Sequence, residues 1–218
     1  MNRPYDLNRT SEEKMRKKPP SKKLIEDFLE ISHRLRQREL TFGGGGGISM
    51  QIPASRKVLI KGWEVASEDA REKDISLVDL DGKQLNRVKP CLETPLHLEA
   101  LKAREDIRAV IHAHSPYLTS FGKVKDRLPK GWLKNYPFLS LSTAFAPYAD
   151  PGSKELAHLV AKPFRQEEII CVIMEDHGVT VVGPDLFKAY YRLDILEGMA
   201  KTFIITKSIQ RTINGKKI

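Results

Sequence analysis

The sequence predicts a mixed fold in which strands and helices pack in layers around one core, either α/β or α+β. The chain has 218 residues, the length of one domain with a sizeable core. Short β-like runs alternate along it with amphipathic helical segments. Hydrophobic residues make up 40% and charged residues 30% of the chain, a balance that excludes an intrinsically disordered protein.

The net charge of +9 lies in the two ends of the chain. Residues 1–40 carry a net +4 and residues 201–218 a net +5, whereas residues 41–200 are neutral, with 21 basic and 21 acidic side chains. Basic ends bind polyanions in some proteins and are only solvated termini in others. No nucleic-acid recognition motif accompanies them, so nucleic-acid binding is not the expected main role.

The composition predicts a basic N-terminal arm over residues 1–20, a single domain over 21–210 and a basic tail over 211–218. The longest apolar run, at 169–174, is far shorter than the roughly 18 residues of a membrane span, and no signal-peptide pattern opens the chain. The two cysteines cannot form a disulfide framework. We therefore expect a reduced, cytoplasmic protein with no membrane partner.

The first predicted element is a helix over residues 22–39, and Ser21, which follows two prolines, is a typical N-cap for it. Apolar residues recur at helical spacing along one face, which we expect to be buried: Leu24, Phe28, Ile31 and Leu35. Beyond the glycine run Gly43–Gly47, strands are expected over residues 48–52, 57–60 and 75–80. The turn Asp81-Gly82 indicates a hairpin partner over residues 83–88.

The second half of the chain continues this alternation. Expected helices cover residues 95–104, a short stretch from 115, 153–164 and 185–208. Expected strands cover residues 107–113, 139–141, 169–174 and 179–182. Residues 123–137 are rich in lysine, proline and glycine and are expected to form a long loop.

Two histidines, His112 and His114, stand at the end of the apolar strand 107–113. Residues two apart in a strand face the same side, so both imidazoles are expected on one face at the end of the sheet. This arrangement is typical of metal ligands, and the alternative is a pair of hydrogen-bonded surface histidines. A third histidine, His177, follows the buried strand 169–174 in the sequence Glu-Asp-His-Gly.

Three histidines at strand ends with one position left open describe a catalytic Zn²⁺ site. Each ligating imidazole needs an acceptor for its other nitrogen, and Asp176 or a backbone carbonyl can provide one. If Cys91 were a fourth ligand, the site would be closed and structural. Three imidazoles also accept Mn²⁺, Co²⁺ or Fe²⁺.

Glu93 precedes the predicted helix at 95–104. A carboxylate there is favoured by the helix dipole, and this alone can explain the residue. Beside a metal, the same carboxylate is a candidate base for removing a carbon-bound proton. The glycine run can form an anion-binding nest of backbone N–H groups or a flexible loop.

The chain resembles the class II aldolase/adducin family in a set of ordered motifs that extends from about residue 22 to 207. These motifs are Gly45-Gly46-Gly47-Ile48-Ser49, Asp79-Leu80-Asp81-Gly82, Glu93-Thr94-Pro95-Leu96-His97, Val110-Ile111-His112-Ala113-His114-Ser115-Pro116, Ala146-Pro147-Tyr148-Ala149-Asp150-Pro151-Gly152-Ser153 and His177-Gly178-Val179.

The resemblance implies a three-layer α/β/α sandwich around a mixed, largely antiparallel sheet. It implies Zn²⁺ on His112, His114 and His177, Glu93 as the acid/base, and a homotetramer with active sites between subunits. In such aldolases the metal chelates the donor and the glutamate makes an enediolate that adds to an aldehyde. A tyrosine protonates the product alkoxide, for which Tyr117, Tyr136 and Tyr148 are candidates.

This sequence departs from the family where the family binds phosphate. The usual Gly-Asn is Gly46-Gly47, the usual Thr/Ser-Gly is Lys61-Gly62, and the usual Ser-Ser before the glutamate is Cys91-Leu92. Gly46, Gly47, Lys61 and Gly62 are the expected substrate- or anion-binding residues. Lys61 either replaces lost hydrogen bonds with a charge or is a solvated lysine, and the donor anion can be a phosphate, a carboxylate or differently placed.

The expected function is a Zn²⁺-dependent aldolase that makes or cleaves a carbon–carbon bond of a small sugar phosphate or related keto compound. Dehydration of a sugar phosphate, or decarboxylation of a keto acid, is the alternative on the same site. A non-catalytic, adducin-like interaction module is a third reading, but such a module has no need of three histidines and a glutamate together.

Overall fold

The structure is a computed structural model that describes residues 19–129 and 142–213. The basic arm up to residue 18, the strand predicted at 139–141, the end of the predicted loop 123–137 and the tail from residue 214 lie outside the described residues. Within the described ranges, no helix is both long and apolar enough to span a bilayer.

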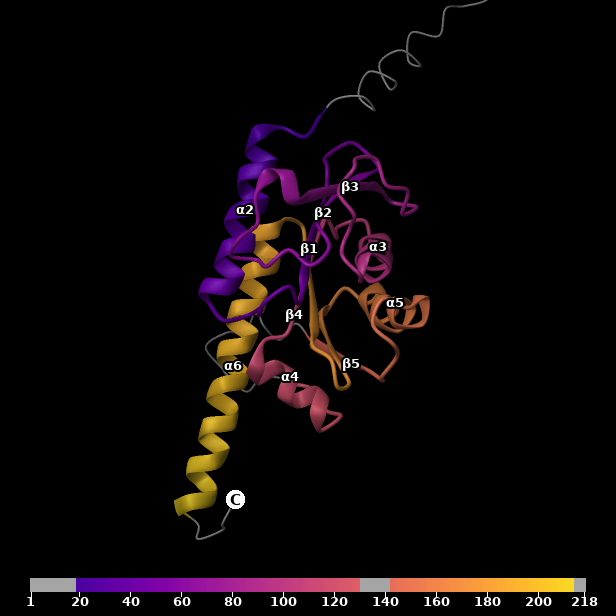
Figure 1. The fold of residues 1–218 in the computed structure, drawn as a ribbon. Coiled ribbons are helices and arrows are strands. Elements are labelled where there is room, and N and C mark those ends of the chain that lie inside the picture. Colours follow the sequence, from indigo (N-terminus) through magenta and orange to yellow (C-terminus); the bar gives the residue numbers. More distant parts are fainter. Residues whose placement is uncertain (1–18, 130–141, 214–218) are drawn as a thin grey trace, which may run out of the picture.

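Seven strands form one mixed sheet in the order β3-β2-β1-β4-β7-β6-β5 (Figure 1). The strands are β1 (Gly47–Gln51), β2 (Lys57–Lys61), β3 (Ile75–Asp79), β4 (Ala109–Ala113), β5 (Ser142–Ala146), β6 (Ile169–Met174) and β7 (Val179–Gly183). Only the pairing of β5 with β6 is parallel, and all other neighbours are antiparallel. The expected mixed, largely antiparallel sheet is therefore confirmed.

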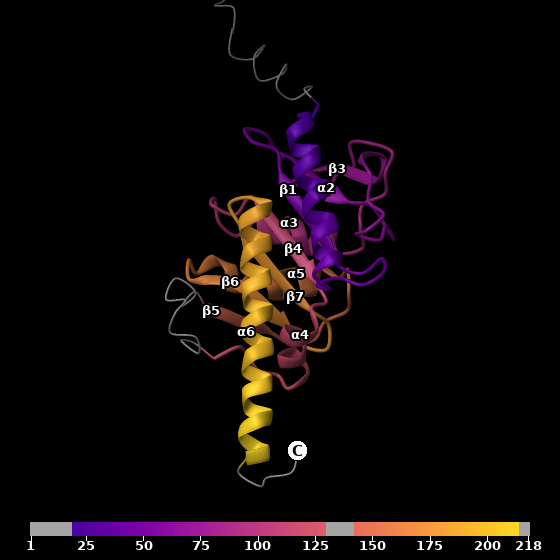
Figure 2. The same ribbon diagram turned by 90° about the vertical axis from the view of Figure 1, so that its left-hand side faces the viewer.

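Helices cover both faces of this sheet, which confirms the three-layer α/β/α arrangement (Figures 1 and 2). One face carries α2 (Lys22–Gln37), α4 (Pro116–Lys123) and α6 (Leu186–Ile213). The other carries α3 (Thr94–Lys102) and α5 (Lys154–Ala161). Each face has its own cluster of buried apolar side chains, which is the main source of stability for such layers.

The first helix forms as the sequence predicts. The Oγ atom of Ser21 accepts a hydrogen bond from the amide of Leu24 at 3.3 Å and caps α2. The predicted apolar face is buried at Phe28, Ile31 and Leu35, which pack against the α6 side of the sheet. Leu24 is half-buried at the edge of the same cluster.

The hairpin partner predicted over residues 83–88 is wrong in its extent. Only Gln84 forms a bridge, with Val78, and no strand follows it. Main-chain hydrogen bonds join Asp79 to Lys83 and Leu85 to Leu77. Beyond Leu85 the side chain of Asn86 replaces the main chain, because it accepts from the amide of Leu77 at 3.1 Å and donates to the carbonyl of Ile75 at 2.9 Å. An asparagine side chain that mimics a peptide in this way ends regular pairing.

Most other elements differ from their predicted bounds by one or two residues, and β5, α5 and α6 differ by more. The strand β5 begins at Ser142, beyond the predicted strand at 139–141. The helix α5 ends at Ala161, because Pro163 starts a separate 3-10 turn, Pro163–Arg165. The helix α6 continues past the predicted end at residue 208 to Ile213, three residues into the segment expected to be a tail.

The sheet brings distant segments together at one end of its central strands. His112 in β4 lies opposite Gly47 of β1 on one side and opposite Thr180 of β7 on the other. His177 lies two residues before the start of β7, and α3 begins directly after Glu93. Four segments that are far apart in sequence therefore meet around the end of β4.

Candidate active site

His112 is the central residue of the site, and its ring is held by a main-chain group. Its Nδ1 atom lies 3.0 Å from the carbonyl oxygen of Val179, the first residue of β7. A carbonyl oxygen only accepts, so Nδ1 carries the hydrogen and Nε2 faces the site. This is the backbone acceptor that metal-ligating histidines require. The alternative acceptor, Asp176, instead forms an ion pair with Lys123 at 2.8 Å.

The structure brings together the three histidines predicted to form a metal site. One nitrogen from each of His112, His114 and His177 lies within 4.8 Å of the others. The Nε2 atoms of His112 and His114 are 3.0 Å apart, and the ring centroids of His112 and His177 are 4.9 Å apart. Such convergence of imidazole nitrogens fits a divalent ion with N ligands. Cys91 is not part of this cluster, so the described residues do not form the closed four-ligand site considered above.

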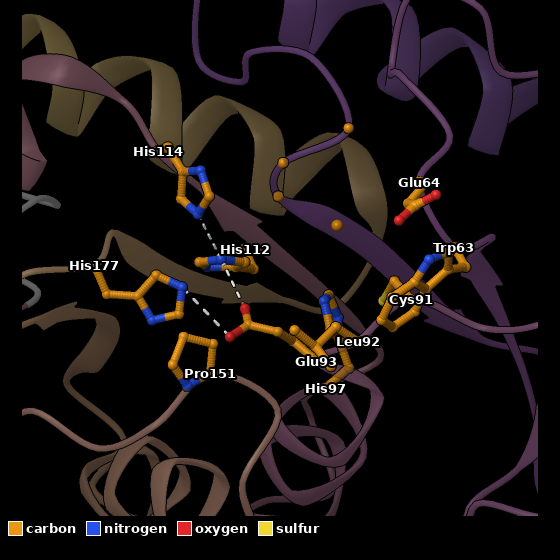
Figure 3. Close-up of a pocket in the computed structure, with 14 residues that line it drawn as sticks. Trp63, Glu64, Cys91, Leu92, Glu93, His97, His112, His114, Pro151 and His177 are labelled. Atoms are coloured by element: carbon orange, nitrogen blue, oxygen red, sulfur yellow. Dashed lines mark hydrogen bonds and ion pairs between the residues drawn. The ribbon is translucent and has the colours of Figure 1, made fainter.

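The carboxylate of Glu93 points into the same cluster. Its Oε2 atom lies 2.7 Å from Nε2 of His112, and its Oε1 atom lies 3.4 Å from Nε2 of His177 (Figure 3). Although Glu93 occupies the N-cap position of α3, its side chain makes no capping hydrogen bond. The side chain is therefore directed at the imidazoles of His112 and His177 and not at the amides of the helix.

Burial and mutual proximity set the protonation of these groups. Burial raises the pKa of the Glu93 carboxyl, but the imidazoles of His112 and His177 outweigh it and lower the value to about 2. Burial lowers the pKa of His114 to about 4, and it also lowers that of His177. Near neutral pH these two imidazoles are thus neutral and Glu93 is ionised, as metal ligation and base catalysis require.

These groups line one cavity of about 370 Å³, together with the segment Gly44–Gly47. The far end of the cavity is formed by Trp63, Glu64, Cys91 and Leu92, away from His114 and His177 (Figure 3). The volume is that of a pocket for a small organic molecule.

The sequence matches the Class II Aldolase and Adducin N-terminal domain over residues 26–204, most of the chain. The chain belongs to this family. An L-fuculose phosphate aldolase from Methanocaldococcus jannaschii is 32% identical over 84% of this chain and 97% of its own length. A 3-oxo-tetronate 4-phosphate decarboxylase from Haemophilus influenzae is 27% identical over 88% of each chain.

A solved structure of L-fuculose 1-phosphate aldolase superposes on this class II aldolase fold with a TM-score of 0.78 and 26% identity. The match covers 87% of this chain and 88% of that chain. The family and these relatives confirm the expected resemblance and the expectation of an aldolase-type lyase enzyme.

The glycine segment of this class II aldolase depends on Lys61, which lies beneath it. Lys61 is 1% exposed, and its ammonium donates to the carbonyl oxygens of Gly44 at 3.0 Å and Gly45 at 3.3 Å. Burial lowers the pKa of this lysine. The interpretation of Lys61 as a solvated lysine is therefore wrong. Lys61 does not line the cavity, so its role toward an anion remains a prediction.

The other predicted anion-binding residues lie in two different places. Gly46 and Gly47 line the cavity, and Gly46 has a φ of +70°, which a glycine adopts without strain. Gly62 does not line it, and its amide donates to the carbonyl of Asp74 at 2.9 Å. The amide of Gly62 is therefore already used within the protein.

Of the tyrosines proposed as proton donors, the two that the structure describes, Tyr117 and Tyr148, do not line the cavity. Tyr148 is 54% exposed and its hydroxyl donates to Asp150, while the Tyr117 ring faces the ammonium of Lys201. Tyr136 lies outside the described residues. The described part of the chain thus offers no tyrosine in this cavity.

One polar residue of the cavity was not singled out from sequence. His97 in α3 is fully buried, and its Nδ1 atom lies 2.9 Å from Oγ of Ser49 in β1. The two residues are 48 positions apart, so only the packing of α3 against β1 brings them together. The sequence contained two signals for His97: its position four residues after Glu93 at a predicted helix, and its place at the end of the family motif Glu93-Thr94-Pro95-Leu96-His97.

Proposed function

We propose that this chain is a metal-dependent class II aldolase that makes or cleaves a carbon–carbon bond of a small sugar phosphate or related keto compound. The observation that carries the proposal is the contact of the Glu93 carboxylate with His112 and His177 within the three-histidine cluster. An adducin-like binding module has no need for an ionised carboxylate among buried imidazoles. The proposal includes the homotetramer and the cytoplasmic location expected from the sequence.

His112, His114 and His177 are proposed to hold the metal, with Zn²⁺ as the first candidate. The donor set fits, because three imidazoles with converging nitrogens suit a borderline divalent ion. When bound, such an ion withdraws electrons from the carbonyl of a keto donor and so makes the neighbouring C–H group more acidic.

Glu93 is proposed to act as the acid/base. Its carboxylate takes a proton from the carbon beside the donor carbonyl, holds it on Oε1 or Oε2, and can return it in the reverse direction. Glu93 itself is buried, with 7% of its surface exposed, which limits competing protonation by water. Gly46 and Gly47 are proposed to allow the substrate close approach to the main chain, while Lys61 supports the glycine segment.

Decarboxylation of a keto acid is the second candidate, and dehydration of a sugar phosphate uses the same groups. The relative from Haemophilus influenzae is named as a decarboxylase, and decarboxylation is therefore tested beside the aldol reaction. Both reactions share the metal ligands, so the cavity alone does not separate them.

The proposal is tested with metal-loaded protein, a short aldehyde, and either dihydroxyacetone or dihydroxyacetone phosphate. Formation of a ketose product that stops on chelation and resumes with Zn²⁺ supports an aldolase. Release of CO₂ from 3-oxo acids, with no ketose from either donor, overturns the aldolase in favour of the decarboxylase. A Glu99→Gln control changes an exposed carboxylate of the same helix and is expected to leave the rate unchanged.

A further inference from the structure

The imidazole of His97 has one nitrogen that meets no partner among the described residues. Its Nδ1 atom faces the hydroxyl of Ser49 at 2.9 Å, but its Nε2 atom is buried with no hydrogen bond from the described protein. Buried polar atoms are nearly always paired, so an orphan in a cavity wall indicates a ligand contact. His97 lines the cavity and lies between Glu93 and Cys91 in Figure 3.

Gly47, which has no side chain, leaves a small space in front of this buried nitrogen. A Cβ atom built on Gly47 would lie 2.9 Å from Nε2 of His97 and 3.4 Å from Sγ of Cys91. Any larger residue would therefore fill the space in front of Nε2. Gly47 pairs with His112 in the sheet, so Nε2 of His97 lies next to the strand that carries this proposed metal ligand.

The same end of the cavity has no cationic side chain among the residues described. The ammonium of Lys61 is turned to two carbonyl oxygens, and that of Lys89 lies 3.6 Å from the ring centroid of Trp63. The wall instead presents the apolar side chains of Trp63 and Leu92 and the carboxylate of Glu64. These groups disfavour a phosphate dianion, because a charge taken from water needs a compensating partner.

We propose that His97 is a substrate-positioning residue, and that the cavity end beside Gly47 binds an uncharged, hydroxyl-bearing end of a keto donor in preference to a phosphate ester. This inference rests on the proposed function and narrows its substrate class. Burial lowers the pKa of His97 to about 3, so the imidazole is neutral near pH 7. A neutral ring can donate to or accept from a hydroxyl group without adding charge.

The first test compares dihydroxyacetone with dihydroxyacetone phosphate as donors for proton exchange in D₂O, using metal-loaded protein and NMR. We expect a KM at least about tenfold lower for dihydroxyacetone, the effect of one net hydrogen bond or one uncompensated charge. His97→Asn keeps a group that can face Ser49 but removes the atom at Nε2, and should raise KM about tenfold with little change in kcat. His97→Gln, whose amide reaches farther, should recover part of the loss.

Gly47→Ala should raise KM in the same way, because its methyl group fills the space before Nε2. His158→Gln, at an exposed position of α5, is the matched control and should change nothing. A lower KM for the phosphate ester, or a His97→Asn variant in which only kcat changes, would overturn the inference.

A binding measurement separates this inference from the proposed function. In protein labelled with ¹⁵N in its imidazoles, the Nε2 signal of His97 is assigned as the one that is missing from the spectrum of His97→Asn. Dihydroxyacetone should shift this signal, and inorganic phosphate should not. An unchanged signal overturns the inference, whether or not exchange occurs. A shifted signal without any exchange overturns only the aldolase proposal.

Discussion

The Nδ1 atom of His112 in β4 donates a hydrogen bond to the carbonyl oxygen of Val179, the first residue of the neighbouring strand β7. The bond fixes one tautomer and directs Nε2 toward His114 and Glu93. The two strands thus set the orientation of the imidazole as well as its position.

Replacing His112 tests this arrangement directly. His112→Ala removes the nitrogen nearest to both His114 and Glu93, so we expect the affinity for Zn²⁺ to fall by at least about 100-fold. Metal content by mass spectrometry and a chelator competition titration measure the loss. His158→Ala, on the exposed face of α5, should retain the metal of the unaltered protein. Full metal content in His112→Ala would show that the cluster is not the site.

Gly178 has no side chain, and this allows the segment after His177 to pack closely against the segment that carries His114. A Cβ atom there would lie 2.5 Å from the carbonyl of Ala113 and 2.7 Å from Cδ2 of His114. Gly178→Ala should therefore displace His114 and weaken metal binding, with a lower melting temperature. Gly198→Ala is the control, because a Cβ in that part of α6 meets nothing within 4 Å and should stabilise the helix by up to about 1 kcal/mol. Equal metal affinity in the two variants would contradict this explanation.

The helix that follows His114 is held by a carboxylate from α6. The two oxygens of Glu197 accept hydrogen bonds from the amides of Tyr117 and Leu118 in the first turn of α4, each at 2.8 Å. Glu197→Ala leaves both buried donors unpaired, and we expect a loss of about 3 kcal/mol in the free energy of unfolding.

Urea unfolding of the metal-free protein measures this loss. Asp194→Ala, one turn earlier in α6, removes a surface ion pair with Arg38 and should cost less than about 1 kcal/mol. Similar losses in the two variants would mean that Glu197 does not hold α4 in the way described.

The stability of the metal-free protein should depend on pH through His97. The pKa of His97 is lowered from its ordinary value of 6.5 to about 3 in the folded protein. Below pH 6.5 this imidazole is therefore protonated in the unfolded chain but stays neutral in the folded one. The free energy of unfolding should fall by about 1.4 kcal/mol per pH unit from this group as pH decreases from 6.5, and be flat above 6.5.

The contribution of His97 is isolated by comparing how steeply the free energy of unfolding depends on pH in the unaltered protein and in His97→Gln. Both proteins are measured by urea unfolding with chelator present. The variant should have a slope smaller by about 1.4 kcal/mol per pH unit between pH 6.5 and 4.5. His114, with its pKa lowered to about 4, contributes a similar slope to both proteins. Parallel curves would show that His97 is not held in the neutral form.

The parts of the site that the sequence could predict are those set by local periodicity. His112 and His114 share one face because side chains alternate along a strand, and His177 follows a strand with a clear apolar run. The helix α2 was predictable for the same kind of reason, from its apolar spacing and the Ser21 cap.

The parts that the sequence could not predict depend on contacts between distant segments. The roles of His97 and Lys61 follow from how α3 and β2 pack beside β1 and the glycine segment, 16 to 48 residues away in the chain. The hairpin partner predicted over residues 83–88 is shorter than expected because, beyond Leu85, the side chain of Asn86 replaces the main-chain pairing.

The measurement that tests the central claim most directly is proton exchange from D₂O into keto donors, with dihydroxyacetone and its phosphate followed separately by NMR. Metal-loaded protein should exchange the proton beside the carbonyl, and chelation should stop it. Glu93→Gln should retain the metal but lower the exchange rate by about 10²- to 10⁴-fold, the usual contribution of a general base, while Glu99→Gln should match the unaltered protein. Exchange by Glu93→Gln at the unaltered rate, or no exchange of either donor by fully metal-loaded protein, would contradict the account.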